Sequence, residues 1–297
     1  SVRRSDGTVQ LLFGVAGAAL EANDFFCQGQ SGMLGIAIDP EFSENRHVFL
    51  FMASNSGKAK TNRVVRLTVN DAYTGVADRK DIVTDIPFKH AFNRWGGAGA
   101  HSGGRIRFSP FDGYLYVTTG DNHNGSLPQD LSRLGGKVLR IDRSGKPAAG
   151  NETPSGGDPR IFTYGHRNVQ GIAFHPVTGR PFVCEHGPGH DDEVTPLKAG
   201  GYDIWVSTRA TLYDPWRSPV NLGPTINTGR IECPASISPD GLIFFIVTDR
   251  PGGFGGYDTW MARRPSQGAA WSEPVNLGPS FNTPSNDELS CVSADGR

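Results

Sequence analysis

Short stretches in which apolar and polar residues alternate recur along the chain at wide, similar intervals. Each has β-branched or aromatic residues at every second position, then a polar residue and usually a proline. The copies begin at Ile36, Ile106, Ile172, Ile237 and, more weakly, Val292, so the starts lie 70, 66, 65 and 55 residues apart. Because strand side chains alternate between two faces, each copy predicts a β-strand with one buried face.

Most copies run into a turn and then a second apolar stretch. The turns are Asp112-Gly113, Thr178-Gly179, Asp240-Gly241 and Asp295-Gly296. Alternation on both sides of a turn predicts a β-hairpin. A hairpin with two further strands, repeated at such intervals, is typical of β-propeller blades. A β-sandwich of unrelated strands is the alternative, and the regular spacing favours the propeller.

We therefore predict an all-β fold with residues 1–297 in one β-propeller domain built from four-stranded antiparallel blades. Counting hairpin starts predicts five blades, with six as the alternative if a degenerate blade lies within 70–100. The last start is cut short at Arg297, and residues 1–15 contain a strand-like stretch without a hairpin start. We expect strands from the two termini to share one blade, which would close the ring and remove exposed edges.

Composition agrees with this fold and narrows the partners. The 39 glycines and 21 prolines make about a fifth of the 297 residues and lie between strand-like runs, which indicates many tight turns. A formal net charge of −1 gives no electrostatic case for nucleic acid. No apolar run is long enough to span a bilayer, so we expect no membrane insertion. The four cysteines form no CxxC pair, which argues against zinc, and we expect buried free thiols rather than disulfides.

From residue 200 onward the sequence repeats itself with a period of 55 residues. Residues 200–205 match 255–260, and residues 220–224 match 275–279. This part resembles the WD40-like PD40 repeats of TolB-type propellers, which implies a possible cell-envelope partner. Asp203 and Asp258 return in each copy. A residue that returns in every blade is more often part of a turn or a hydrogen bond between blades than a catalytic group.

Residues 1–199 carry a different set of motifs. They are Gly29 to Phe42, His101-Ser-Gly-Gly-Arg105, Gly136-Lys-Val-Leu-Arg140, Gly165-His-Arg-Asn-Val-Gln-Gly171 and Glu185-His-Gly-Pro188. In this order and spacing they resemble the soluble pyrroloquinoline-quinone-dependent aldose sugar dehydrogenases (glucose/sorbosone dehydrogenases). The resemblance implies a six-bladed propeller and a small-molecule sugar as substrate. We thus expect a hybrid propeller, with dehydrogenase-like blades over 1–199 and PD40-like blades over 200–297.

The same resemblance implies roles for individual residues. His101 matches the base that takes the proton of the sugar C1 hydroxyl, and histidine titrates near neutrality. Arg167 and Asn168 match a pair that lies against the quinone, and Arg167 also against the substrate; a guanidinium can stack on a planar quinone and pair with its carboxylates. Gln30 matches a polar residue that faces the sugar. Without the resemblance, a loop histidine or a hydrogen bond between blades is the favoured interpretation of His101, and a salt bridge to a neighbouring blade is the alternative for Arg167.

A calcium ion is the second cofactor that the resemblance implies. Gly187 and Pro188 match positions whose backbone carbonyls bind Ca²⁺, which accepts such oxygen ligands. The run Asp121-Asn-His-Asn-Gly125 looks like a calcium loop, but such a run is usually a turn. Family analogy places the protein in the periplasm or outside the cell.

The family's further cofactor anchors have no match after residue 199, where the PD40-like sequence stands. Two alternatives to a dehydrogenase follow. One is a non-catalytic hybrid or PD40-type propeller that serves as a scaffold or binding module with a vestigial half-site. The other is a calcium-dependent hydrolase or lactonase, which needs several carboxylates around one metal.

Overall fold

The alternating stretches form antiparallel hairpins in the computed structural model. The structure describes residues 2–3, 6–57, 59–91, 96–186, 193–199, 204–206, 208, 211, 214, 220–228 and 232–287. The chain divides into two compact units, Ser1–Gly201 and Tyr202–Arg297. Within the described residues, no helix is both long and apolar enough to cross a membrane.

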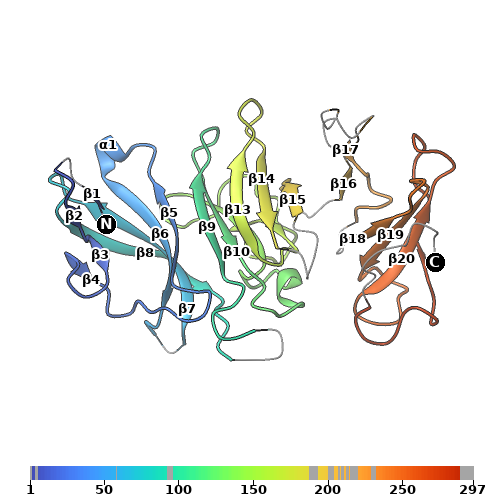
Figure 1. The fold of residues 1–297 in the computed structure, drawn as a ribbon, viewed down its shortest axis with the longest axis horizontal. Coiled ribbons are helices and arrows are strands. Elements are labelled where there is room, and N and C mark those ends of the chain that lie inside the picture. The colour runs from blue at the N-terminus through green and yellow to red at the C-terminus, as the bar shows by residue number, and fades with distance from the viewer. Residues whose placement is uncertain are drawn as a thin grey trace. The chain divides into compact units, whose positions relative to one another are not determined.

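The first unit contains two four-stranded sheets and one three-stranded sheet, which lie side by side (Figure 1). The first sheet has the order β5 (Met33–Ile38), β6 (His47–Ser54), β7 (Thr61–Val69) and β8 (Val76–Ile86), with the one-turn helix α1 (Phe42–Asn45) after β5. The second has β9 (Gly103–Phe108), β10 (Leu115–Thr119), β11 (Lys137–Ile141) and β12 (Ile161–Tyr164), with the 3₁₀ turn η1 (Leu127–Gln129) before β11. The third has β13 (Val169–Phe174), β14 (Pro181–Glu185) and β15 (Glu193–Pro196).

Short strands at the N-terminus form two small sheets. The strands β1 (Val2–Arg3) and β2 (Val9–Gln10) pair antiparallel, and β3 (Phe13–Gly14) and β4 (Leu20–Glu21) pair parallel. The predicted partner of this segment, the hairpin start at 292, lies outside the described residues. The closed ring therefore stays a prediction, and so do the blade count and the single propeller domain.

The second unit has one complete sheet in its described part. It consists of β18 (Glu232–Ile237), β19 (Ile243–Thr248), β20 (Asp258–Arg263) and β21 (Val275–Asn276), paired in that order. A separate two-stranded sheet pairs β16 (Trp205–Val206) with β17 (Val220–Asn221). The all-β fold of antiparallel propeller blades is thus confirmed. The four hairpins predicted from Ile36, Ile106, Ile172 and Ile237 are β5–β6, β9–β10, β13–β14 and β18–β19.

Residues 70–100, where a degenerate blade was the alternative, contribute β8 to the first sheet. The described part of this stretch, 70–91 and 96–100, contains no further strand.

The period-two alternation explains how the sheets of the first unit pack. In β6, Phe49 and Phe51 join a cluster that includes residues of the second sheet, whereas Leu50 and Met52 join a cluster on the opposite face. In the second sheet, alternate positions such as Tyr116 belong to the cluster shared with the third sheet. Each central strand is therefore buried on both faces, as expected for blades packed face to face.

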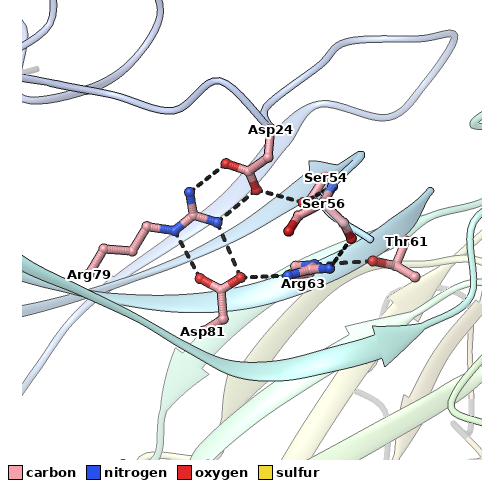
Figure 2. Close-up of polar contacts among 7 residues, drawn as sticks. All are labelled: Asp24, Ser54, Ser56, Thr61, Arg63, Arg79 and Asp81. Atoms are coloured by element: carbon pink, nitrogen blue, oxygen red, sulfur yellow. Dashed lines mark hydrogen bonds and ion pairs between the residues drawn. The ribbon is translucent and has the colours of Figure 1, made fainter. Parts of the chain in front are cut away.

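A network of charges fastens the segment before β5 to the outer strands of the first sheet (Figure 2). The Arg79 guanidinium donates to both Asp24 oxygens, at 2.6 and 2.8 Å, and to Asp81 at 2.8 Å from Nε. Arg63 donates to Asp81 at 2.8 Å, and the Ser54 hydroxyl donates to Asp24 at 2.6 Å. The bidentate hydrogen bond from Arg79 is the main cause that holds the pKa of Asp24 well below its usual range.

Two cysteines are free and exposed, so the expectation of buried thiols is wrong for them. Along β14, burial alternates, and Cys184 falls on the more exposed face between the buried Val183 and Glu185. Cys27 lies in the loop before β5. The side chains of the other two cysteines lie outside the described part of the chain.

Candidate active site

The site residues predicted from sequence lie in loops that lead into β5, β9 and β13. These are the first strands of three neighbouring sheets and are called the innermost strands below. Gln30 precedes β5, His101 precedes β9, and Arg167 and Asn168 directly precede β13. The His101 backbone N–H donates to Gln30 Oε1 at 3.1 Å. These hydrogen bonds and those below bring together four predicted residues that are up to 138 positions apart, from 30 to 168.

The innermost strands run in the same direction, which puts these loops at one end. Gly103 N–H donates to Asn168 Oδ1 at 3.2 Å. Two residues further on, Arg105 donates to the Leu34 carbonyl at 2.7 Å and to the Gln170 carbonyl at 2.9 Å. Arg105 thus ties β9 to both neighbours in a parallel register. The predicted site residues therefore lie together where the chain enters the three innermost strands.

Close backbone approach is built into this arrangement by glycine. A Cβ on Gly35 would lie 2.2 Å from the carbonyl oxygen of Gly104, and one on Gly120 would lie 2.1 Å from that of His101. Both contacts are far shorter than any side chain tolerates. Glycine at these two positions therefore allows β5 to approach β9 and the loop after β10 to approach His101.

His101 is buried and pairs with a carboxylate that the sequence analysis did not select. Its Nδ1 lies 2.7 Å from Asp121 Oδ1, and the two side chains are 6% and 10% exposed. An ionised carboxylate only accepts hydrogen bonds, so it favours the tautomer with the proton on Nδ1 and leaves the lone pair on Nε2. His101 thereby has the tautomer of a general base. Because residues 121–125 resemble a calcium loop, Asp121 was not predicted as a partner of His101. The sequence signal for this partner is its position just after β10, beside β9.

Asp121 also fixes a second histidine. The same oxygen, Oδ1, accepts the backbone N–H of His123 at 2.8 Å. The rings of His101 and His123 lie 3.4 Å apart between centroids and are inclined by 30°. Burial is the main cause that lowers the pKa of His123 to about 4, aided by electrostatic interactions with His101, Lys89 and Arg167 and opposed by Asp121. His123 is therefore neutral at physiological pH.

Backbone strain is concentrated here. Among the described residues, six that are not glycine have a positive φ. Three of them belong to this pair of loops: His101 at 50°, Asn122 at 55° and His123 at 53°. Left-handed conformations are costly for residues with a side chain and persist where the surrounding structure enforces them, commonly at functional sites.

A buried lysine secures the loop that carries Asp121 and His123. Lys137 is fully buried and donates from Nζ to the carbonyls of Leu127, at 2.9 Å, and Gly135, at 2.7 Å. Burial lowers its pKa to about 7, with Asp130 opposing the shift. Both carbonyls lie in the segment between β10 and β11, so Lys137 ties two points of that segment together.

Arg167 is held by the end of β14. Its backbone N–H donates to Glu185 Oε2 at 2.9 Å, and its guanidinium donates to the carbonyl of His186 at 3.0 Å. The other oxygen of Glu185 lies 3.3 Å from Nδ1 of the buried His166, whose Nε2 lies 2.8 Å from the Thr163 hydroxyl. Glu185 thus joins the Arg167–Asn168 loop to the chain just before residue 187.

The predicted calcium ligands cannot be placed in the same way. Gly187 and Pro188 lie outside the described residues. Within the described part of the chain, no group of three or more His, Cys, Asp or Glu side chains is placed to hold a metal. The ligand set implied by the sequence consists of backbone carbonyls and stays a prediction. Lys89 and Arg167, which both act on His123, bring positive charge that fits a planar polyanion such as a quinone carrying carboxylates.

A cavity of about 830 Å³ runs along the same innermost strands. Its lining includes Ile36 and Ile38 of β5, Arg105 and Arg107 of β9, and Ile172 of β13. The predicted site residues are not among the described residues that line it. The cavity follows the strands, whereas the site lies where the chain enters them.

The repeated polar residues of the second unit have structural partners. Asp258 Oδ2 accepts hydrogen bonds from the Phe254 backbone N–H and from Asn276 Nδ2 at 2.8 Å, which links β20 to β21. Arg250 donates to the Ile226 carbonyl at 3.0 Å and contacts Glu232 at 3.4 Å. Asp258 thus stabilises the turn before β20 and the β20–β21 pair within one sheet, which agrees with the predicted turn role and not with a bond between blades. Asp203 lies outside the described residues.

Comparison with known proteins points to one family. The model of the family described as Glucose / Sorbosone dehydrogenase matches residues 2–252, which extends past the boundary at 199 expected from sequence. Aldose sugar dehydrogenase YliI of Escherichia coli (strain K12) is 30% identical over 208 residues, covering 68% of this chain and 54% of that protein. The chain therefore spans about half the length of the curated relatives that it matches.

Solved structures agree. A structure described as an oxidoreductase (glucose dehydrogenase) from Thermus thermophilus is 33% identical and superimposes with a TM-score of 0.54, covering 92% of this chain and 77% of the other. The PQQ-bound aldose sugar dehydrogenase of Streptomyces coelicolor is 27% identical, with a TM-score of 0.53, covering 89% of this chain and 72% of the other.

Proposed function

Because the chain belongs to the glucose/sorbosone dehydrogenase family, we propose that it is a quinone- and calcium-dependent aldose sugar dehydrogenase in which His101 is the base. The pairing of His101 with Asp121 at 2.7 Å, beside Asn168 and Arg167, is the observation that carries the proposal. It supplies a histidine with its tautomer set for proton abstraction at the entrance to three innermost strands.

The residues of the chain divide the work as follows. His101 Nε2 accepts the proton of the sugar C1 hydroxyl, and Asp121 stabilises the imidazolium that forms. Gln30 holds the His101 backbone through its Oε1 and faces the sugar. Asn168 accepts a hydrogen bond from the Gly103 backbone N–H at the start of β9. This bond fixes the position of the nearby His101 relative to β13.

Arg167 is the main residue for binding the quinone, and Lys89 supplies a second positive charge near His101 and His123. Arg167 would hold the quinone by stacking and by pairing with a carboxylate, and the carbonyls of Gly187 and Pro188 would hold Ca²⁺. When bound, such a quinone supplies the acceptor for the hydride of C1, and the calcium ion polarises it. A small-molecule sugar is the substrate, and the periplasm or the cell exterior is the proposed location.

Reconstitution tests the proposal. The purified protein is incubated with pyrroloquinoline quinone and Ca²⁺, and dye reduction is followed with glucose and other aldoses. We expect saturable turnover that is lost on chelation of calcium. For a substitution at His101, His175→Ala is the matched control, because this exposed histidine lies in the turn between β13 and β14. Absence of both turnover and quinone binding by calorimetry would overturn the proposal in favour of a non-catalytic scaffold or binding module.

A further inference from the structure

His123 packs against the face of His101, a contact that the proposed reaction does not by itself require. The centroid distance of 3.4 Å and the inclination of 30° describe two stacked imidazoles. His123 comes from the loop after β10, whereas His101 comes from the loop before β9, so the stack joins two separate loops. We propose that His123 is a positioning residue that clamps the His101 imidazole from one face, so that the base keeps the single ring orientation set by Asp121. This inference rests on the proposed function.

The anchoring of the two rings supports this role. Asp121 Oδ1 accepts from His101 Nδ1 at 2.7 Å and from the backbone N–H of His123 at 2.8 Å. One oxygen therefore sets the orientation of the first ring and the backbone position of the second. Any rotation of His101 about its side-chain bonds would break the hydrogen bond and collide with the stacked ring at once.

The backbone at Gly96 lies close to one edge of the half-buried His123 ring. A Cβ added to Gly96 would lie 2.9 Å from His123 Nε2 and 3.3 Å from the Ala100 Cβ. The His123 ring thus contacts His101 through its face and has the Gly96 backbone near its Nε2 edge. These two contacts restrict the ring orientations open to His123.

Burial, aided by the charge of the surroundings, keeps His123 neutral. The charged and titratable groups that act on His123 are His101, Lys89 and Arg167, which disfavour its protonation, and Asp121, which favours it. Two stacked imidazoles also cannot both be protonated without strong repulsion. A neutral His123 therefore leaves Asp121 free to stabilise the charge that His101 gains as a base.

Two substitutions separate the ring from the backbone. The left-handed φ of 53° at position 123 disfavours most side chains but suits asparagine, so His123→Asn removes the ring with little backbone cost. His123→Phe keeps an aromatic face without a titratable group. His175→Asn is the control at an exposed turn, where it removes one histidine signal without touching the site.

The first readout needs no cofactor. In the apo protein, ¹⁵N NMR of the histidine side chains reports the tautomer of each ring. We expect His101 in the Nδ1-protonated tautomer in wild type, His123→Phe and His175→Asn, and an averaged, exchange-broadened signal in His123→Asn. In wild type, His123 should titrate near pH 4. Unchanged His101 signals in His123→Asn, or a His123 that titrates near its ordinary pKa, would overturn the proposal.

The second readout is the division between kcat and KM in the reconstituted protein. We expect kcat to fall about 10- to 100-fold in His123→Asn, with KM within about twofold, because a misaligned base costs rate and not binding. His123→Phe should restore kcat to within about threefold of wild type. Equal losses in both variants, or a change confined to KM, would contradict a positioning role. If the wild type has no turnover, the proposed function fails, while the NMR comparison still decides the role of His123.

Discussion

Asparagines in the two units of the molecule illustrate two uses of the same side chain. In the second unit, Asn227 and Asn282 make the same pair of bonds 55 residues apart. Ile204 N–H donates to Asn227 Oδ1 at 2.7 Å, and Asn227 Nδ2 donates back to the Ile204 carbonyl at 3.0 Å. Thr259 and Asn282 repeat this clamp at 2.8 and 3.0 Å.

Asn168 of the first unit behaves differently. Its Oδ1 accepts the Gly103 N–H at 3.2 Å from a neighbouring sheet and the Gln170 amide at 2.9 Å from its own strand. It has no copy at a fixed spacing in the other sheets, and it lies where His101 and Arg167 converge. A polar side chain that recurs in each repeat stabilises its own blade. A polar side chain that occurs once and joins two different sheets marks a candidate position for an active site.

The largest expected effect follows from removing the proposed base, His101, from the first unit. His101→Gln should lower kcat of the reconstituted protein about 10²- to 10⁴-fold, because general-base catalysis contributes that much. The melting temperature should change little, since glutamine can still donate to Asp121. A variant with more than a tenth of wild-type kcat would show that His101 is not the base.

Asp121→Asn should have the next largest effect. An amide can donate to Nδ1, so it favours the wrong tautomer of His101 and removes the charge that stabilises the imidazolium. We expect kcat to fall about 100-fold while quinone binding, measured by calorimetry, is retained. Asp258→Asn is the matched control in the second unit, where the carboxylate binds β21 and the Phe254 backbone. It should leave kcat unchanged, and a comparable loss in both variants would erase the distinction between the two regions.

On the structural side, Asn282→Ala should lower stability without lowering kcat. It leaves a buried N–H and a buried carbonyl of Thr259 without their partners, which costs about 2 kcal/mol in the free energy of unfolding. Urea unfolding followed by tryptophan fluorescence measures this loss. Asn227→Ala should cost a similar amount at Ile204 if the two clamps are equivalent. A fall in kcat of the folded variant by more than threefold would place the repeat in the active site.

The smallest expected effect concerns the charge network of the first sheet. Asp24→Asn should lower the free energy of unfolding at pH 7 by about 1–2 kcal/mol, because it breaks the partly buried bidentate bond to Arg79. The pKa of Asp24 is lowered in the folded state. Its contribution is therefore full above the unfolded pKa of about 4 and declines as the pH falls below that value.

Denaturation at pH 7 and at pH 3 measures this dependence. The difference in the free energy of unfolding between wild type and Asp24→Asn should be smaller at pH 3 than at pH 7. The exposed pair of Arg46 with Asp71, whose side chain is 91% exposed, is the control. Asp71→Asn should change stability by less than about 0.5 kcal/mol at both values of pH. An Asp24→Asn effect as small as this would show that the network does not hold the N-terminal segment.

Much of the fold could be predicted because its signals are local. Alternation over five residues marked the start near Ile36, and alternation with a following turn identified the hairpins that begin near Ile106, Ile172 and Ile237, since strand periodicity and turn chemistry act over short distances. The 55-residue repeat indicated a structural role for Asp258, because a residue that recurs in each repeat usually stabilises the repeated unit. Burial of single side chains was harder: Cys184 lies on an exposed face although its neighbours in the sequence are buried.

The sequence by itself determined the strands, the turns, the family motifs and the presence of His101, Arg167, Asn168 and Gln30, because these depend on residue type and near neighbours. Only the tertiary structure decided that Asp121 contacts His101 from 20 positions away, that Gln30 reaches His101 across 71 positions and that His123 stacks on His101. Such contacts arise where sheets pack and loops converge. No local pattern encodes them, since each partner is specified by the packing of segments that are distant in the chain.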